Sequence, residues 1–265
     1  MSNLYGKVAV VTGAGQGQGR TVAKRLAKDG AAVIVTDIIR ETAEATAEQI
    51  TEEGGKTIAF VADLGEYKQA EAMIALALSQ FGQLDILCNV AGVGPGGNMA
   101  SPGKKFWETT PEEWERDVRN NLYTCLNCCK AALGHMMERR SGKIVNWDSA
   151  AILVGLGVGM TVYRATKGAI YTLTKCLARE LGQHNITVNS IAPGIIVADP
   201  DTRPPMAHLS PEQQKAWMSE RVKTVPLGRV GTGEDIASVA AFLVSDEASW
   251  ITGQSICVSG GETVR

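Results

Sequence analysis

The chain has 265 residues, with 26 Lys and Arg against 28 Asp and Glu, a formal net charge of -2 and 29 Gly. This near balance argues against a nucleic-acid-binding surface and against a basic membrane patch. No apolar run is long enough to span a bilayer, and no charged-then-apolar leader precedes the first strand, so we expect a cytoplasmic protein that is not held in a membrane. Because no linker or internal repeat stands out, we predict a single catalytic domain over residues 1–265.

The six cysteines are expected to be reduced thiols, since the sequence has no secretion signal. Three of them, Cys125, Cys128 and Cys129, suggest a metal site by number alone. They fall within a helical pattern, however, and no nearby His has ligand spacing. We therefore interpret them as buried small apolar side chains and expect no metal.

A β-branched segment over residues 7–12 leads into a glycine-rich turn and then a helical pattern. Glycines at such a turn let the backbone approach a pyrophosphate, and the helix N-terminus supplies N–H donors and the positive end of a dipole. The flanked turn therefore predicts a dinucleotide-binding loop. Its candidate contacts are Gly13, Gln16, Gly17 and Gln18.

The second strand, residues 32–36, ends at Asp37, with Ile38 beside it. An acid about 20 residues beyond the glycine loop accepts hydrogen bonds from both adenosine ribose hydroxyls and repels a 2′-phosphate, so we favour NAD over NADP. Arg40 leaves an opening for NADP, because its guanidinium could reach that phosphate. A simple turn aspartate is the alternative interpretation of Asp37.

The pattern continues with helices over residues 40–53 and 67–81 and strands over residues 57–62 and 84–90. At the end of the first of these strands, Asp63 can hydrogen-bond the adenine amino group while Leu64 lines the ring. Strands alternating with helices of this length predict a doubly wound parallel sheet of the Rossmann type. We expect seven strands, flanked by helices on both faces.

Two segments are candidate substrate lids. Residues 93–110 are rich in Gly and Pro, and they are either a neutral surface insertion or a lid with Phe106 and Trp107 as substrate walls. The composition of residues 199–225 indicates a mobile substrate loop with one or two short helices.

A Pro followed by acids predicts a long helix over residues 111–139. The next strand, residues 142–147, ends at Asp148 and Ser149, where doubly wound folds place their chemistry. Ser149 can donate to, or accept from, a substrate oxygen. We assign no catalytic role to Asp148.

The helix predicted over residues 161–183 carries Tyr163 and Lys167, which lie four residues apart and so on one face. An ammonium near a phenol favours the phenolate, so we expect the pKa of Tyr163 to fall below its usual value of about 10. A tyrosine tuned in this way passes a proton to or from an oxygen near neutral pH. For this spacing alone, an ordinary aromatic residue beside a surface lysine is the simpler interpretation, but the glycine loop and Ser149 favour the catalytic one.

Further strands over residues 186–191 and 255–258 and a helix over residues 234–244 complete the predicted sheet. Taken in order, the motifs of the chain resemble the short-chain dehydrogenase/reductase family over nearly its whole length. They are Thr12-Gly13 with Gly17 and Gly19, Asp63-Leu64, Asn89-Val90-Ala91-Gly92, Asn121, Ser149, Tyr163 with Lys167, and Pro193-Gly194.

The resemblance implies roles for several of these residues. Asn89, Ala91 and Gly92 would contact the cofactor, and Ile196 would bind its carboxamide through the backbone N–H and C=O. Lys167 would hold the nicotinamide ribose, and Asn121 would kink its helix and hold a water of the proton relay.

Three departures from the family pattern are visible. Val90 replaces an Asn, which we expect to be harmless because Val can pack. The interval from Ser149 to Tyr163 is one residue longer than in many members. The threonine often found four residues after Pro193 is replaced, so one hydroxyl contact to the cofactor is expected to be missing.

We therefore expect an NAD(H)-dependent oxidoreductase that interconverts a small-molecule secondary alcohol and a ketone. Its expected catalytic residues are Asn121, Ser149, Tyr163 and Lys167. The alternatives are an NAD-using epimerase or dehydratase on the same scaffold, or a non-catalytic dinucleotide sensor, and the fold alone does not separate them. The apolar content of the helices over residues 111–139 and 161–183 predicts a homotetramer. It includes Leu126, Leu133, Ile170, Leu173 and Leu177.

Overall fold

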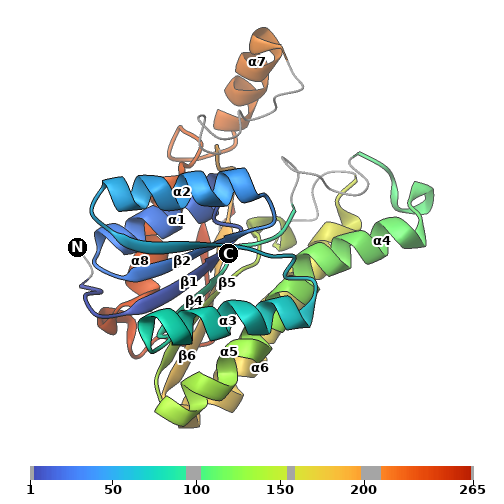
Figure 1. Ribbon diagram of the computed structural model, residues 1–265. Helices are drawn as coiled ribbons and strands as arrows, with labels where there is room; N and C mark the ends of the chain where they lie inside the picture. The colour runs from blue at the N-terminus through green and yellow to red at the C-terminus, as the bar shows by residue number, and fades with distance from the viewer. Residues whose placement is uncertain (1–2, 94–102, 154–158, 198–209, 264–265) are drawn as a thin grey trace.

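Short segments rich in β-branched residues form one parallel sheet at the centre of the protein. The computed structural model describes residues 3–93, 103–153, 159–197 and 210–263 (Figure 1). Within these ranges the strands are β1 Val8–Thr12, β2 Ala32–Asp37, β3 Lys56–Val61, β4 Ile86–Asn89, β5 Gly142–Trp147, β6 Ile186–Pro193 and β7 Ser255–Val258. Their order is β3-β2-β1-β4-β5-β6-β7, and every pairing is parallel. The predicted seven-stranded Rossmann-type sheet is confirmed.

Helices cover both faces of the sheet, as predicted (Figure 1). One face carries α1 Gly17–Lys28, α2 Arg40–Glu52 and α8 Gly233–Val244, and the other carries α3 Tyr67–Phe81, α5 Thr124–Arg139 and α6 Thr161–Leu181. Alternate residues of a strand point to opposite faces, so Val11 packs in the first core and Val10 in the second. Within the described residues, no helix combines the length and the apolar character needed to cross a bilayer.

The strand order reverses between β1 and β4, since the chain goes to β2 and β3 on one side before it continues on the other. In open α/β sheets a ligand crevice forms at such a switch point, outside the carboxyl ends of the strands. The crevice here is therefore bounded by the residues that follow β1, β4 and β5.

The helix predicted over residues 111–139 is interrupted. α4 Pro111–Val118 is followed by a π-helical turn, Arg119–Tyr123, before α5 begins. The amide of Asn121 donates to the carbonyl of Asp117, 3.0 Å away, and Thr124 Oγ1 donates to the carbonyl of Asn121, 3.0 Å away. Single π turns often mark functional positions, because one extra residue re-aims the side chains around it. Asn121 thus lies at a distortion, as the family resemblance implied.

Smaller boundary differences also have local causes. β4 ends at Asn89 because the N–H of Val90 turns back to the carbonyl of Cys88, 3.1 Å away. β6 extends to Pro193 because its last residue still pairs with Val258 of β7.

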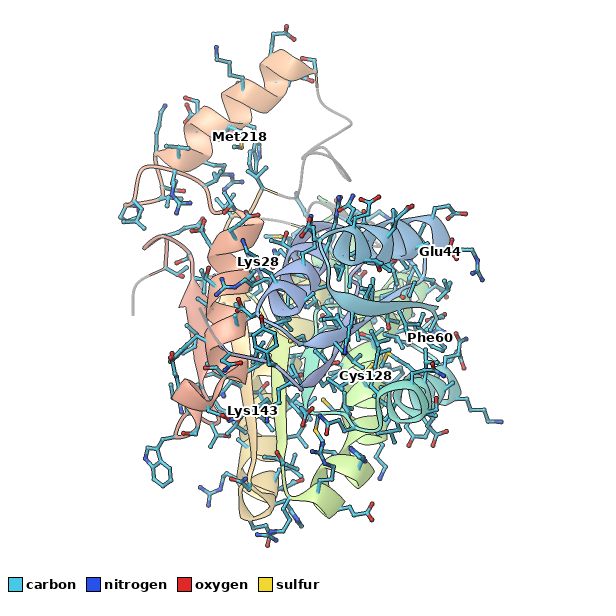
Figure 2. All side chains as sticks on the ribbon, turned by 60° about the vertical axis from the view of Figure 1, so that its left-hand side comes forward. Lys28, Glu44, Phe60, Cys128, Lys143 and Met218 are labelled. Carbon is cyan, nitrogen blue, oxygen red and sulfur yellow. The ribbon has the colours of Figure 1, made fainter. Side chains whose placement is uncertain are left out.

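The cysteines of α5 are packing residues, as predicted. Cys125, Cys128 and Cys129 are buried between α5 and the sheet, where Figure 2 labels Cys128. Burial raises the pKa of the Cys128 thiol. Among the described residues, no group of His, Cys, Asp or Glu could hold a metal ion.

A buried acid closes the opposite, amino-terminal edge of the sheet. Asp85 accepts from the backbone N–H of Val8 and from Gln83 Nε2, each at 2.8 Å, and forms an ion pair with Arg139 at 3.1 Å. It is 4% exposed. This acid ties β1 and α5 together far from the crevice.

Parts of both predicted lid segments are described. In the first, the 3₁₀ turn Phe106–Glu108 precedes α4, and residues 94–102 lie outside the described residues. In the second, α7 Pro211–Val222 extends away from the sheet body, where Figure 2 labels Met218, and residues 198–209 lie outside the described residues. The expected short helix of the second segment is confirmed, and the role of both segments as lids stays a prediction.

Candidate active site and dinucleotide crevice

The glycine loop after β1 is shaped by close backbone approaches. A Cβ on Gly13 would lie 2.8 Å from the Cα of Ala91, and Gly13 has φ of 61°. A Cβ on Gly19 would meet the carbonyl of Gly13. These contacts pack the start of α1 against β1 and β4, so only glycine fits at both positions.

The N-terminus of α1 is open toward the crevice. Its N-cap, Gln16, makes no side-chain capping hydrogen bond with the described residues, and a Cβ on Gly17 would meet no described atom within 4 Å. The side chain of Gln18 is fixed from the other side, because its Oε1 accepts from the indole N–H of Trp147 at 3.0 Å. The loop thus presents uncapped N–H groups and open space, which suits a phosphate group.

Asp37 lies directly against this loop. Its carboxylate accepts from the N–H of Gly15 at 3.0 Å and from the N–H of Ile39 at 3.1 Å, and the residue is 7% exposed. Ile38, next to it, is exposed. Arg40 is turned away on the first turn of α2 and pairs with Glu44 at 3.0 Å.

Asp63, at the end of β3, has a partner that sequence analysis missed. Arg119 of the π-helical turn pairs with it at 2.9 Å and with Glu66 at 2.7 Å. The N–H of Gly65 also donates to Asp63, at 2.9 Å. Leu64 is buried in the core beneath. Each carboxylate oxygen of Asp63 thus has one donor, and its second lone pair is open to a ligand donor.

The segment after β4 crosses the crevice floor. Thr12 Oγ1 accepts from the N–H of Ala91 at 3.0 Å, which holds this segment against β1. Asn89 is buried, and its amide donates to Asn146 Oδ1 at 2.9 Å. Val90 packs against the first core, so its departure from the family pattern is accommodated.

Tyr163 and Ser149 meet at the carboxyl end of β5. Both are 7% exposed, and the Ser149 hydroxyl is hydrogen-bonded to the Tyr163 phenol. Ser149 Oγ also accepts from the N–H of Ala151 at 3.2 Å, which fixes its rotamer. The two hydroxyls therefore face one point in the crevice.

The expected lowering of the Tyr163 pKa is wrong for this structure. Burial raises the pKa of Tyr163, the Asp148 carboxylate raises it further, and the hydrogen bond from Ser149 and the charge of Arg164 oppose the increase. Among the described residues, Lys167 forms its hydrogen bond with a backbone carbonyl and not with the Tyr163 phenol. Its Nζ lies 6.0 Å from the Tyr163 ring centroid and donates to the carbonyl of Trp147 at 2.7 Å.

Lys167 itself is a buried cation. It is 5% exposed, and burial lowers its pKa to about 8, while Cys125 and Asp148 oppose that decrease. A Cβ on Gly92 would lie 3.6 Å from Lys167 Nζ and 2.7 Å from Asn121 Oδ1. The structure thus brings the Asn121 amide oxygen and the Lys167 ammonium close to the same point beside Gly92.

A second Tyr–Lys pair with the same spacing lies two turns further along α6. Lys175 Nζ is 4.6 Å from the Tyr171 ring centroid, and Lys175 is exposed. This pair is of the ordinary kind that sequence analysis weighed against catalysis. Burial beside Ser149 is what distinguishes Tyr163.

Ile196 lies where its backbone can face the crevice. The carbonyl of Ile195 and the N–H of Val197 both bond Gly231, at 2.9 Å each. Because backbone groups alternate along an extended chain, the N–H and C=O of Ile196 point to the side away from Gly231. That orientation suits recognition of a carboxamide, which has both a donor and an acceptor.

A shallow cavity adjoins Tyr163 and is shared with the first lid segment. Phe106 stacks on Trp114 with ring centroids 5.4 Å apart, whereas Trp107 is exposed. Gly103 and Gly159 touch so closely that a Cβ on Gly159 would meet the backbone of Gly103. The cavity is lined by Lys104, Phe106, Thr109, Asp117, Gly159, Met160, Thr161, Val162 and Tyr163.

These features fit a nicotinamide dinucleotide along the crevice. An uncapped helix start after β1, an acid at the end of β2 and a carboxamide-compatible backbone after β6 follow one another along the chain. Sequence analysis found these positions by motif. It missed the roles of Trp147 and Arg119, because no local pattern links them to Gln18 and Asp63, which lie far away along the chain.

Comparison with known proteins agrees with the fold. The family model described as Enoyl-(Acyl carrier protein) reductase matches residues 13–263. The chain is 40% identical over 256 residues to 3-oxoacyl-(acyl-carrier-protein) reductase FabG of Staphylococcus aureus, covering 96% of this chain and 97% of that protein. It is 34% identical over 261 residues to (2S)-((R)-hydroxy(phenyl)methyl)succinyl-CoA dehydrogenase subunit BbsD of Thauera aromatica, covering 98% of both.

One similar solved structure is a 7α-hydroxysteroid dehydrogenase complexed with NADH and 7-oxo glycochenodeoxycholic acid. It has a TM-score of 0.86 and 32% identity, and the match covers 98% of this chain and 95% of that one. The protein is thus an oxidoreductase of the Rossmann type, and it belongs to the short-chain dehydrogenase/reductase family. Members of this family use a nicotinamide dinucleotide.

Replacing Lys167 by Met removes a buried ammonium but leaves the buried Asp148 carboxylate without its counter charge, so the ligand-free variant is expected to be less stable at pH 7 by about 3–5 kcal/mol, as for the loss of one partner of a buried ion pair. The Lys167 pKa is about 8 in the folded protein and near 10.4 when unfolded, so between these values the unfolded chain binds more protons. The cost of the ammonium is therefore full below pH 8 and fades as the pH rises toward 10.

Urea denaturation of both proteins at pH 7 and pH 9.5 measures this difference. We expect the variant's deficit to be larger at the higher pH, because the unmodified protein becomes more stable as its buried ammonium loses the proton. An equal deficit at both pH values would contradict the assignment of Lys167 as a costly buried charge.

Proposed function

We propose that the protein is an NAD(H)-dependent oxidoreductase that interconverts a secondary alcohol and a ketone. The observation that carries the proposal is the buried Tyr163 phenol, hydrogen-bonded to Ser149 at the carboxyl end of β5 with Lys167 one turn away. The names of the three relatives support it. Each name describes an enzyme whose substrate or product is a ketone or the corresponding secondary alcohol.

The proposed chemistry gives each side chain a task. The nicotinamide ring supplies or accepts the hydride. In reduction, Tyr163 donates its phenolic proton to the carbonyl oxygen as the carbon receives the hydride; in oxidation the phenolate takes the hydroxyl proton. Ser149 holds the substrate oxygen beside Tyr163. Lys167 and Asn121, which both lie beside Gly92, return the proton from solvent.

The raised pKa of Tyr163 makes the rates of the two directions depend on pH in opposite ways. Near neutral pH the group is a phenol, so it is ready to donate a proton. Reduction then needs no prior ionisation, whereas oxidation becomes easier as the pH rises. This supports a carbonyl reductase at neutral pH.

Replacing Tyr163 by Phe is expected to reduce turnover by about 10²- to 10⁴-fold, because the ring still packs but the transferable proton is gone. Binding of NADH, followed by fluorescence titration, should be nearly unchanged. Tyr171→Phe is the matched control, since it removes a hydroxyl from the other Tyr–Lys pair of the same helix and should leave turnover unaltered. If Tyr163→Phe keeps more than half of the activity, Tyr163 is not the acid/base.

We propose NAD as the preferred cofactor, with NADP less favoured. The support is the Asp37 carboxylate, which lies against the glycine loop where it could accept from ribose hydroxyls, while the exposed Arg40 pairs with Glu44 on the same helix. The proposed contacts are the glycine loop with Gln16 and Gln18, Asp37 and Ile38 at the ribose, Asp63 and Leu64 at the adenine, Asn89, Ala91 and Gly92 below, and Tyr163, Lys167 and Ile196 at the nicotinamide end.

Asp37→Ala is expected to weaken NAD by about one to two decades in affinity, since a charge-assisted hydrogen bond contributes roughly 1.5–3 kcal/mol. It should relax the discrimination against NADP without making NADP a strong ligand. Steady-state kcat/KM with both cofactors measures the effect, and Arg40→Ala, on the same turn, should leave the NAD value unchanged. A preference of the unmodified protein for NADP would show that Arg40 reaches the phosphate.

We further propose a cytoplasmic homotetramer, with all 265 residues in one catalytic domain. The support is the outer surface of α5 and α6, where Leu126, Leu133, Leu173 and Leu177 are only partly buried, although Ile170 is used in the core. Tyr123 and Met137 are exposed beside them. Sedimentation at micromolar concentration should give a tetramer. A monomer would contradict this, and a dimer would show that only one of these surfaces is used.

A further inference from the structure

Asp148 is a buried acid at the carboxyl edge of the sheet, one residue before Ser149. It is 2% exposed. Its Oδ2 accepts from Ser190 Oγ of β6 at 2.8 Å and from Ser255 Oγ of β7 at 2.7 Å. Its Oδ1 has no hydrogen-bond partner among the described residues. The side chain therefore joins three adjacent strands, β5, β6 and β7.

The same acid lies beside the proposed proton-transfer residues. Lys167 donates to the carbonyl of Trp147, the residue immediately before Asp148. Within the described residues, the titratable groups that act on this cluster are few. Asp148 and Arg164 act on Tyr163, Asp148 and Cys125 of α5 act on Lys167, and Lys167 acts on Asp148, while β6 and β7 contribute only hydroxyls.

We propose that Asp148 is a positioning residue whose buried carboxylate keeps the Lys167 ammonium charged and the Tyr163 phenol protonated. The inference rests on the proposed function of these two residues. It extends that function by identifying the Asp148 carboxylate as the negative charge that balances the buried Lys167 ammonium.

The hydrogen-bond geometry favours the ionised acid. Two hydroxyls donate to one oxygen, which stabilises the negative form, and a proton on Oδ1 would find no acceptor among the described residues. Burial works in the other direction and raises the pKa of Asp148, while Ser255, Ser190 and Lys167 lower it. Ser255, Ser190 and Lys167 thus stabilise the ionised form of the buried Asp148 carboxylate.

The negative charge of Asp148 should act on the pKa values of Tyr163 and Lys167 in the same direction. It raises the pKa of Tyr163 and opposes the decrease in the pKa of Lys167. A merely structural tie between three strands would hold the strands together but would not shift either titration. The protonation state of Tyr163 therefore separates the two roles.

The test compares Asp148→Asn and Asp148→Ser with Asp85→Asn, which makes the same change at a buried acid on the opposite edge of the sheet. Tyrosine labelled with ¹³C at Cζ reports ionisation by NMR without any substrate, and Tyr163→Phe assigns the signal. Far-UV circular dichroism defines the pH range in which each protein is folded. The serine variant supplies a small polar side chain if the asparagine variant does not fold.

We expect Tyr163 to titrate about one pH unit lower in the Asp148 variants, as for removal of a nearby like charge. The pH dependence of kcat/KM for reduction of ethyl acetoacetate with NADH should fall off at correspondingly lower pH, with unchanged NADH affinity. Asp85→Asn should lower stability and leave both the Tyr163 titration and the pH dependence of kcat/KM unchanged.

A folded Asp148 variant whose Tyr163 titration does not move would overturn the inference, and Asp148 would then be a structural tie only. An equal shift in Asp85→Asn would also overturn it. If Tyr163→Phe remains active, the proposed function fails, but the NMR titration still decides whether Asp148 acts on Tyr163.

Discussion

The burial of one positive charge, that of Lys167, is the constraint on which the rest of the catalytic edge depends. A buried ammonium that has lost its water shell needs a hydrogen-bond acceptor and a nearby negative charge. The carbonyl of Trp147 supplies the first at 2.7 Å, and Asp148 supplies the second. Both come from the end of β5, so the helix that carries Lys167 must lie against that strand. Tyr163, one turn earlier on α6, is thereby brought to Ser149.

The two halves of the crevice are mechanically linked at the π-helical turn. Arg119 of that turn pairs with Asp63 and Glu66 on the adenine side, while Asn121, two residues later, faces Gly92 and Lys167. An α-helical turn would place these two side chains about 200° apart around the axis, and the extra residue of the π turn alters that relation. A short distorted segment thus serves both the binding and the proton-transfer ends of the site.

Most of the fold could be predicted from the sequence, because parallel strands and amphipathic helices leave strong local patterns, as in residues 142–147 and 255–258, whose strands begin and end as predicted. Ser149, Tyr163 and Lys167 could be chosen by motif. The sign of the Tyr163 pKa shift could not, because it depends on burial and on Asp148 more than on helical spacing. The partners of Asp148 lie 42 and 107 residues away along the chain, and no local pattern identifies them.

The place of Ser255 in the chain has a consequence for the order of assembly. β7 is at the edge of the sheet and is the last of the described strands in sequence. Until it docks on β6, Asp148 has the Ser190 hydroxyl but lacks that of Ser255. A chain at that stage could already hold a complete glycine loop, because β1 to β4 precede it. The nucleotide-binding loop would then form before the proton-transfer residues reach their final arrangement, because that arrangement needs the last strand.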